Sequence, residues 1–207
     1  MPNRGRPRRS LCDYMTKQPK TYQREKPIVL CGMMGAGKSA VGRQLANISG
    51  LELFDLDQEI IRKENLSIPE IFDQYGESRF RETEREVLSE LWQHPDRIIS
   101  LGGGALQDLD FAKRVREHSL LVYLKASVSV LVERVANKKK RPLLLNCDGS
   151  LKTESELREF LKHLIQKRED GYKCAHIHFT VDNNHNVRNT AERLWNEILA
   201  YEQKSRS

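Results

Sequence analysis

The stretch Gly32–Ser39, which reads GMMGAGKS, decides the fold. Its spacing matches G-x-x-x-x-G-K-[ST], a loop that holds phosphates between a buried strand and a helix. The glycines let successive N–H groups turn toward one anion, and the helix adds the positive end of its dipole. Lys38 can reach the β- and γ-phosphates, and the Ser39 hydroxyl can ligate Mg²⁺. The loop predicts nucleotide binding, whereas a glycine turn that binds nothing is the alternative. The expected ATP contacts are Gly35, Ala36, Gly37, Lys38, Ser39 and Ala40.

Apolar strands and amphipathic helices alternate on both sides of this loop. Pro27–Gly32 is a continuous apolar run, typical of a parallel strand buried on both faces. Ser67 with Glu70 and Thr153 with Glu156 have the spacing of capping boxes. Five strands separated by helices predict a three-layer α/β domain with a parallel sheet. The other strands are expected at 51–57, 97–101, 120–126 and 176–182, and the helices at 38–49, 59–64, 67–93 with a break near Gly76, 108–117, 127–137, 153–174 and 187–202.

The positive charge is concentrated at the start of the chain. The 207 residues carry a formal charge of +6, and residues 1–26 contain eight basic against two acidic residues. The rest of the chain is therefore neutral. This segment has three prolines and little apolar periodicity, so we expect 1–26 to be a disordered basic extension and 27–203 to be one domain. An inert extension is favoured, and a transit peptide or a nucleic-acid-binding tail are the alternatives.

Composition also predicts the compartment. No apolar run approaches the roughly 18 residues that a membrane-spanning helix needs, so no membrane partner is expected. The segment before residue 27 has no apolar core of a secretory signal. The four cysteines have no paired spacing, which favours a reducing, cytoplasmic location over a disulfide framework or a zinc site.

Two carboxylates follow the second expected strand. Asp55 and Asp57 are two residues apart, and strand residues at this spacing point the same way. Both can then face one pocket at the carboxyl edge of the sheet, where ligands bind in open α/β folds. The strands expected at 97–101 and 120–126 do not end in Asp, so this pair takes the place of the usual metal-binding Asp. The alternative is an ordinary turn with Asp57 as a helix cap.

At this point residues 27–200 resemble the shikimate kinase family. Each shared motif is modest alone, but their order and spacing together are specific. The resemblance implies a P-loop kinase fold with a mobile lid over about 138–150. It implies ATP-dependent phosphorylation of the 3-hydroxyl of shikimate to shikimate 3-phosphate, in aromatic amino acid biosynthesis, by an enzyme that is usually a monomer. The shared motifs are GMMGAGKS at 32–39, FDLDQEI at 54–60, ESRFRETE at 77–84, LGGGA at 101–105, RPLL at 141–144 and the spaced pair Arg168 and Tyr172.

The resemblance also implies the substrate-binding residues. Arg81 and Arg168 would hold the carboxylate, for which a guanidinium offers a planar two-pronged fork. Gly103 and Gly104 would let backbone N–H groups approach the ring. Asp57 would bind the reacting hydroxyl and accept its proton. The alternatives are a surface pair of Arg81 with Glu77 or Glu84, a solvated Arg168 and a plain turn at Gly102–Gly104.

On the nucleotide side, Lys38 and Arg141 would stabilise the transferring phosphoryl group. Ser39, and Asp55 through water, would hold Mg²⁺, and Arg134 would flank the adenine. Two competing functions stay open. One is a kinase for another small polyol acid such as gluconate, which the two arginines and the glycine loop disfavour. The other is an idle P-loop module that binds nucleic acid through its basic extension.

Overall fold

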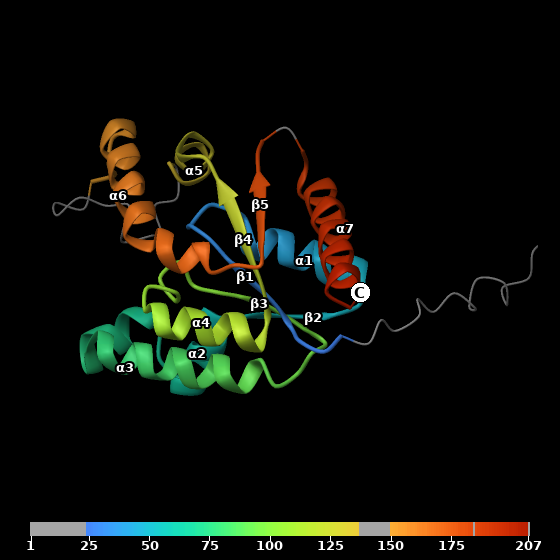
Figure 1. The fold of residues 1–207 in the computed structure, drawn as a ribbon. Coiled ribbons are helices and arrows are strands. Elements are labelled where there is room, and N and C mark those ends of the chain that lie inside the picture. Colours follow the sequence, from blue (N-terminus) through green and yellow to red (C-terminus); the bar gives the residue numbers. More distant parts are fainter. Residues whose placement is uncertain (1–23, 137–149, 184, 207) are drawn as a thin grey trace, which may run out of the picture.

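A parallel five-stranded sheet with helices on both faces forms the protein (Figure 1). The computed structural model describes residues 24–136, 150–183 and 185–206. The strand order is β2-β3-β1-β4-β5, so the strand before the phosphate loop lies at the centre of the sheet. This confirms the predicted three-layer α/β fold. The strands are β1 Ile28–Cys31, β2 Glu52–Asp55, β3 Arg97–Ser100, β4 Leu120–Ala126 and β5 Ile177–Val181.

Two helical layers cover the sheet (Figure 1). The first layer contains α1, α5, α7 and most of α6, and the second contains α2, α3 and α4. The last turn of α6 crosses toward the second layer, because Tyr172 belongs to the core on that side. The helices are α1 Lys38–Ser49, α2 Leu56–Glu64, α3 Ile68–Leu91, α4 Leu109–His118, α5 Val128–Val135, α6 Glu154–Lys173 and α7 Val187–Arg206.

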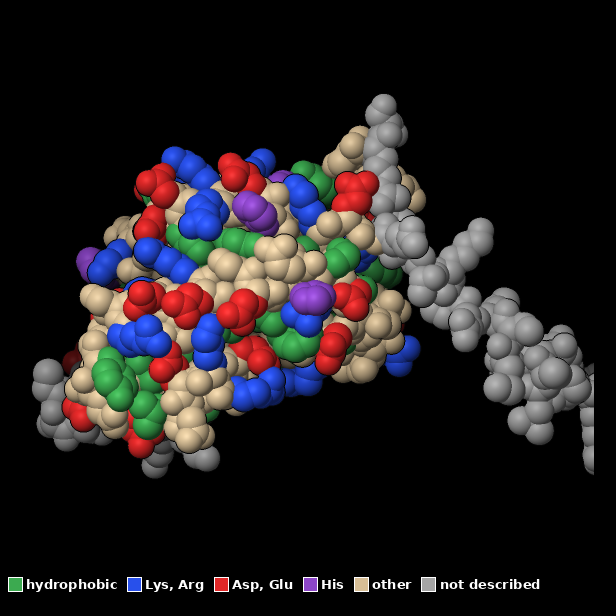
Figure 2. Space-filling model, turned by 90° about the horizontal axis from the view of Figure 1, so that it is seen from below, with side chains coloured by type: hydrophobic (Ala, Val, Ile, Leu, Met, Phe, Trp, Pro, Cys, Tyr) green, Lys and Arg blue, Asp and Glu red, His purple; other side chains and the backbone are tan. Residues whose placement is uncertain are grey.

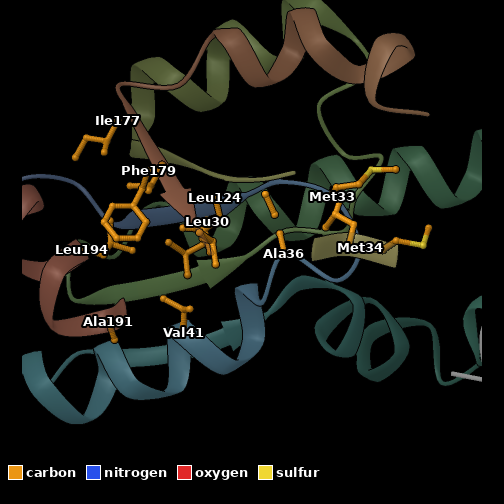
Figure 3. Close-up of a cluster of buried hydrophobic side chains, with 14 of the residues drawn as sticks. Leu30, Met33, Met34, Ala36, Val41, Leu124, Ile177, Phe179, Ala191 and Leu194 are labelled. Atoms are coloured by element: carbon orange, nitrogen blue, oxygen red, sulfur yellow. The ribbon is translucent and has the colours of Figure 1, made fainter. Parts of the chain in front are cut away.

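The central strand separates two apolar cores. In β1, Ile28 and Leu30 face the first core, whereas Val29 and Cys31 face the second, and all four are buried. Figure 3 shows Leu30 within the first core, which α1 and α7 complete. Burying one such aliphatic side chain contributes about 1.5–3 kcal/mol. The apolar run at this strand is therefore explained by burial on both faces.

The helix starts predicted from the two capping boxes, and the predicted break at Gly76, are confirmed. Ser67 and Thr153 both form capping boxes, with their side chains accepting from the backbone N–H groups of Glu70 and Glu156. Gly76 interrupts α3 with a φ of 76° and a ψ of 176°. The kink divides α3 into two halves, and the second half carries Arg81 and Glu84.

The second strand ends earlier than predicted. Asp55 is its last residue, and Leu56 begins α2, so Asp57 lies in the first helical turn. The argument that both carboxylates leave one strand face is therefore wrong. Leu56 is fully buried, and its inward packing starts the helix at once. Acidic side chains in a first turn also stabilise the helix through its dipole.

Two predicted segments meet the limits of the described chain. Residues 24–26 belong to the predicted extension, but the Arg24 side chain is buried and lies 2.6 Å from Glu202. The predicted lid lies outside the described residues except for Ser150, and so does Arg141. In the described part of the chain, no helix is long and apolar enough to span a membrane. On the face covered by α2, α3 and α4, acidic and basic side chains are interspersed (Figure 2).

Candidate functional site

A cavity of about 590 Å³ opens at the carboxyl edge of the sheet. The phosphate loop, the first turn of α1 and the ends of β2 and β3 contribute to its wall. The six ATP contacts predicted in Gly35–Ala40 line it, and so do Asp55, Asp57 and Gly103. Arg81 and Arg168 do not line this cavity; Arg168 lies beside Gly103 and Gly104, and Arg81 beside Gly104. The site therefore has a nucleotide part and an adjoining cationic part.

The glycines of the phosphate loop adopt the turned backbone conformation that was expected of them. Gly35 and Gly37 have φ values of 83° and 99°, in the left-handed region that favours glycine. Gly37 is the N-cap of α1, so the loop leads directly into the positive end of the helix. Lys38 Nζ lies 2.8 Å from the Gly32 carbonyl oxygen and donates to it. Its flexible side chain carries a cation directly over the loop.

Ser39 and Asp55, the two predicted metal ligands, lie next to each other. The Ser39 hydroxyl donates to Asp55 Oδ2 at 3.0 Å. One oxygen comes from the start of α1 and the other from the end of β2, at the mouth of the cavity. Hydroxyl and carboxylate oxygens are the hard ligands that Mg²⁺ prefers. The donor set therefore fits a magnesium ion that takes its remaining ligands from water and phosphate.

Asp57 faces the glycine loop from the first turn of α2. A side chain at Gly102 would place its Cβ 2.9 Å from Asp57 Oδ1 and 3.6 Å from Glu84 Oε1. The first contact is closer than a Cβ tolerates, so a side chain at Gly102 would displace the Asp57 carboxylate, whereas the second is an ordinary van der Waals contact. Asp57 also lines the cavity that contains the phosphate loop. Its carboxylate thus lies between the nucleotide part and the cationic part of the site.

The two predicted substrate arginines meet at the glycine loop. A Cβ at Gly104 would lie 3.0 Å from Arg81 Nη2 and 3.6 Å from Arg168 Nη2. A Cβ at Gly103 would lie 3.1 Å from Arg168 Nη1. Arg81 comes from the second half of α3, and Arg168 from the end of α6. The glycines leave room for two guanidinium groups, so Gly102–Gly104 is more than a plain turn.

Arg81 is held in place by two carboxylates. Its Nη1 lies 2.7 Å from Glu84 Oε2, and its Nη2 lies 3.1 Å from Glu77 Oε1. The Glu84 side chain is only 2% exposed, whereas that of Glu77 is 65% exposed. Burial raises the pKa of Glu84, Arg81 opposes this, and nearby Asp57 adds to it. The alternative of a surface pair therefore describes Glu77 but not Glu84, a buried residue that sequence reasoning missed as part of the site.

Arg168 is buried, which contradicts the alternative of a solvated side chain. Its Nε is buried without a hydrogen-bond partner, and its Nη1 contacts the sulfur of Met33 at 3.6 Å. No carboxylate pairs with it among the residues that the structure describes. A buried cation is costly unless an opposite charge compensates it. The environment of Arg168 therefore fits a bound anion.

Tyr172 joins the glycine loop to α6. Its hydroxyl donates to the Gly103 carbonyl oxygen at 2.7 Å and lies 3.8 Å from the Met33 sulfur. Burial raises the pKa of Tyr172, so the phenol keeps its proton and remains a donor. The spacing of Arg168 and Tyr172 drew attention to Tyr172 in the sequence. Its hydrogen bond to the Gly103 carbonyl could not be predicted from the sequence.

Arg134 connects the phosphate loop to the segment after β5. Its Nη1 donates to the carbonyls of Gly35 and Ala36, at 3.4 and 3.3 Å. Its Nη2 donates to the Asp182 carbonyl at 2.9 Å, and its Nε to Asn183 Oδ1 at 3.0 Å. Arg134 also lines the cavity. Its role beside the adenine remains a prediction.

Comparisons with known proteins agree with this geometry. Residues 34–199 match the family model described as Shikimate kinase. A shikimate kinase of Chlorobium limicola is 38% identical over 174 residues, which are 84% of this chain and 87% of the relative. One of Novosphingobium aromaticivorans is 43% identical over 159 residues, 75% of this chain and 78% of that protein.

Solved structures give the same likeness. The shikimate kinase of Acinetobacter baumannii in complex with shikimate has a TM-score of 0.72 and 34% identity, covering 84% of this chain and 93% of that one. The shikimate kinase of Bacteroides thetaiotaomicron has a TM-score of 0.76 and 30% identity, covering 83% and 97%.

Proposed function

Because this chain belongs to the shikimate kinase family, we propose that it transfers the γ-phosphoryl group of ATP to the 3-hydroxyl of shikimate. The products are shikimate 3-phosphate and ADP, within aromatic amino acid biosynthesis. One observation supports the substrate above all: Arg81 and Arg168 converge on Gly104, beside a cavity that contains the phosphate loop. Shikimate has one carboxylate and three hydroxyls, so it needs cationic forks on one side and acceptors on the other.

The acceptor hydroxyl is placed by Asp57. With the carboxylate held at the two arginines, the ring lies along the glycine loop, and its 3-hydroxyl faces Asp57 at the cavity wall. Asp57 accepts a hydrogen bond from this hydroxyl and takes its proton as the phosphoryl group moves. The arginines and Asp57 thereby orient the nucleophile, and positioning of this kind supplies much of the rate in phosphoryl transfer.

The phosphoryl donor is bound by the phosphate loop. Backbone N–H groups of Gly35–Lys38 and the start of α1 hold the phosphates, and Lys38 neutralises charge on the transferred group. When bound, Mg²⁺ neutralises further charge on the β- and γ-phosphates. Ser39 would hold this ion directly and Asp55 through water. Arg141, which lies outside the described residues, would add a second cation as the lid closes.

The proposal extends to the setting of the enzyme. We expect a Mg²⁺-dependent monomer in the cytoplasm, with shikimate and ATP as its small-molecule partners. Neither a membrane nor a nucleic acid takes part in the reaction. Size-exclusion chromatography with light scattering tests the monomer, and loss of turnover on chelation of divalent cations, restored by added Mg²⁺, tests the metal.

A coupled ADP-release assay on the full purified chain tests the function. We expect ADP release with Mg-ATP that depends on shikimate and not on gluconate. Lys38→Met is the matched control, because it removes the loop cation and should abolish turnover in the same assay. Turnover with gluconate alone, or none with shikimate, would show that the assignment of the substrate is wrong.

A further inference from the structure

The side-chain amide of Gln107 lies beside the two substrate arginines. A Cβ at Gly104 would be 2.7 Å from Gln107 Nε2, closer than to either guanidinium. The same point is 3.0 Å from Arg81 Nη2 and 3.6 Å from Arg168 Nη2. Nitrogen atoms from the loop after β3, from α3 and from α6 therefore surround one small space above Gly104.

Two backbone turns hold Gln107 close to Gly104. The N–H of Ala105 donates to the Gly102 carbonyl at 3.3 Å, and the N–H of Gln107 donates to the Gly104 carbonyl at 3.2 Å. These two turns fold the loop back over itself. Asp108 then caps α4 by accepting from two backbone N–H groups of its first turn, at 3.0 and 3.1 Å. Gln107 is thus held between a turn and a helix cap, so its side chain starts from a defined position.

The three groups differ in what else they contact. Arg81 already pairs with Glu77 and Glu84, and Arg168 contacts the sulfur of Met33. The Gln107 amide makes no hydrogen bond within the described part of the chain, and its side chain is exposed. An amide can donate two N–H bonds without adding charge, and an ionised carboxylate can accept about four hydrogen bonds. One carboxylate can therefore satisfy two guanidinium forks and an amide together.

We propose that Gln107 is a third substrate-binding residue, which donates a hydrogen bond to the carboxylate of shikimate beside Arg81 and Arg168. This inference rests on the proposed function. Because the amide is neutral, it adds a directed donor to a cluster in which a third cation would repel the other two. Gln107 thereby sharpens the preference for an ionised, planar carboxylate at this end of the substrate.

Steady-state kinetics of two substitutions test the role. Gln107→Met keeps the length but removes the donor, and we expect the KM for shikimate to rise about tenfold, with the KM for ATP unchanged. Gln107→Glu places a negative charge beside the substrate carboxylate and repels it, so the KM should rise further, about thirtyfold. Gln93→Met and Gln93→Glu are matched controls, because Gln93 is an exposed glutamine near the start of β3. Both should leave the kinetics unchanged.

The methyl ester of shikimate distinguishes a contact with the carboxylate from a general disturbance of the loop. The ester has no negative charge to repel, so the extra penalty of Gln107→Glu over Gln107→Met should disappear. If both variants keep the KM for shikimate within about twofold of the parent, or if the extra penalty persists with the ester, the inference is wrong. A parent chain without shikimate-dependent turnover would overturn the proposed function and this inference together; a fully active parent with unaffected variants overturns this inference alone.

Discussion

At the scale of residues, the buried guanidinium of Arg168 has the surroundings that a bound anion would complete. Arg168 has an unpartnered Nε and no carboxylate beside it in the described chain, yet it lies against the loop where the substrate is expected. A bound carboxylate would supply both the missing charge and the missing acceptor. Lysine would retain the charge but lose the planar fork that matches two carboxylate oxygens.

We therefore predict that Arg168→Lys raises the KM for shikimate about thirtyfold and leaves the KM for ATP nearly unchanged. Initial rates at varied shikimate and saturating ATP provide the measurement. Lys167→Arg, on the neighbouring position of α6, is the control and should have parent kinetics. Equal increases in both KM values would mean that Arg168 maintains the fold rather than the substrate contact.

Glu84 gives a prediction about pH. Its pKa is raised from 4.5, chiefly by burial, so the folded state binds this proton more tightly than the unfolded state. As pH rises from about 4.5 through the folded-state pKa, Glu84 therefore lowers the free energy of unfolding. Glu84→Gln removes this contribution, so the unfolding free energy of the variant relative to the parent should increase with pH across that window.

Urea denaturation at a series of pH values measures this difference. Glu77→Gln is the control, because it removes the exposed carboxylate beside the same arginine, where solvent weakens the interaction. A variant-minus-parent difference that stays flat or falls with pH would contradict the assignment of a raised pKa to Glu84.

The placement at the site of residues within a short motif could be predicted, and that of residues that depend on tertiary contact could not. The phosphate loop, Asp57, Arg81 and Arg168 are each marked by neighbouring residues. Glu84 looked like one more helical charge until burial distinguished it from Glu77. The residues next to Gln107 in the sequence do not point to a place in the site, because that place depends on two arginines from other elements.

At the scale of elements, local chemistry predicts where helices and strands begin, but not how they are ordered in space. The capping boxes at Ser67 and Thr153 are complete within four residues, which is why sequence reveals them. The order β2-β3-β1-β4-β5 depends on pairing between distant segments. The error at Asp57 has a related cause: the strand was expected to run to Asp57, but the buried Leu56 already begins a helix.

The contact of α6 with the glycine loop depends on a helical glycine. A Cβ at Gly171 would overlap the carbonyl oxygen of Leu106, which is backbone and cannot turn aside. The neighbouring Tyr172 bonds to Gly103, and Arg168 lies one turn earlier. Gly171 therefore lets α6 approach closely enough to bring both side chains to the site.

Gly171→Ala should consequently lower the melting temperature and raise the KM for shikimate about tenfold, with a smaller effect on the KM for ATP. In an unobstructed helix the same change would stabilise the protein by about 1 kcal/mol, so the sign of the effect is informative. Differential scanning calorimetry and initial rates measure the two quantities. Ser155→Ala, at an exposed position of α6, is the control. A stabilised Gly171→Ala variant with parent kinetics would contradict the close approach.

At the scale of the whole molecule, the two ends of the described chain meet away from the site. Arg24 precedes β1, and Glu202 lies near the end of α7, so their ion pair is at the edge of the sheet opposite the phosphate loop (Figure 1). The Arg24 side chain is 2% exposed and that of Glu202 is 16% exposed. The count of charges includes Arg24 in the predicted basic extension, because the sequence does not distinguish a basic residue that pairs within the fold from one in a tail.

The location of this pair predicts a loss of stability without a loss of catalysis. Glu202→Leu leaves the Arg24 guanidinium buried without its counter-charge, so we expect about 3 kcal/mol of destabilisation in urea denaturation. Arg24→Leu combined with Glu202→Leu removes both charges and should recover most of that loss. The kcat and both KM values should stay within about twofold of the parent at temperatures where the variants are folded.

Glu192→Leu, on the same helix, is the matched control. Its partner Arg188 is 75% exposed and Glu192 itself 47%, so this change should cost only about 0.5 kcal/mol. If the double substitution is as destabilised as the sum of the two single ones, the two charges do not act as a pair. If Glu202→Leu alters the KM for shikimate while the protein remains folded, the far edge of the sheet is coupled to the site, and the separation between a stabilising edge and a catalytic edge is wrong.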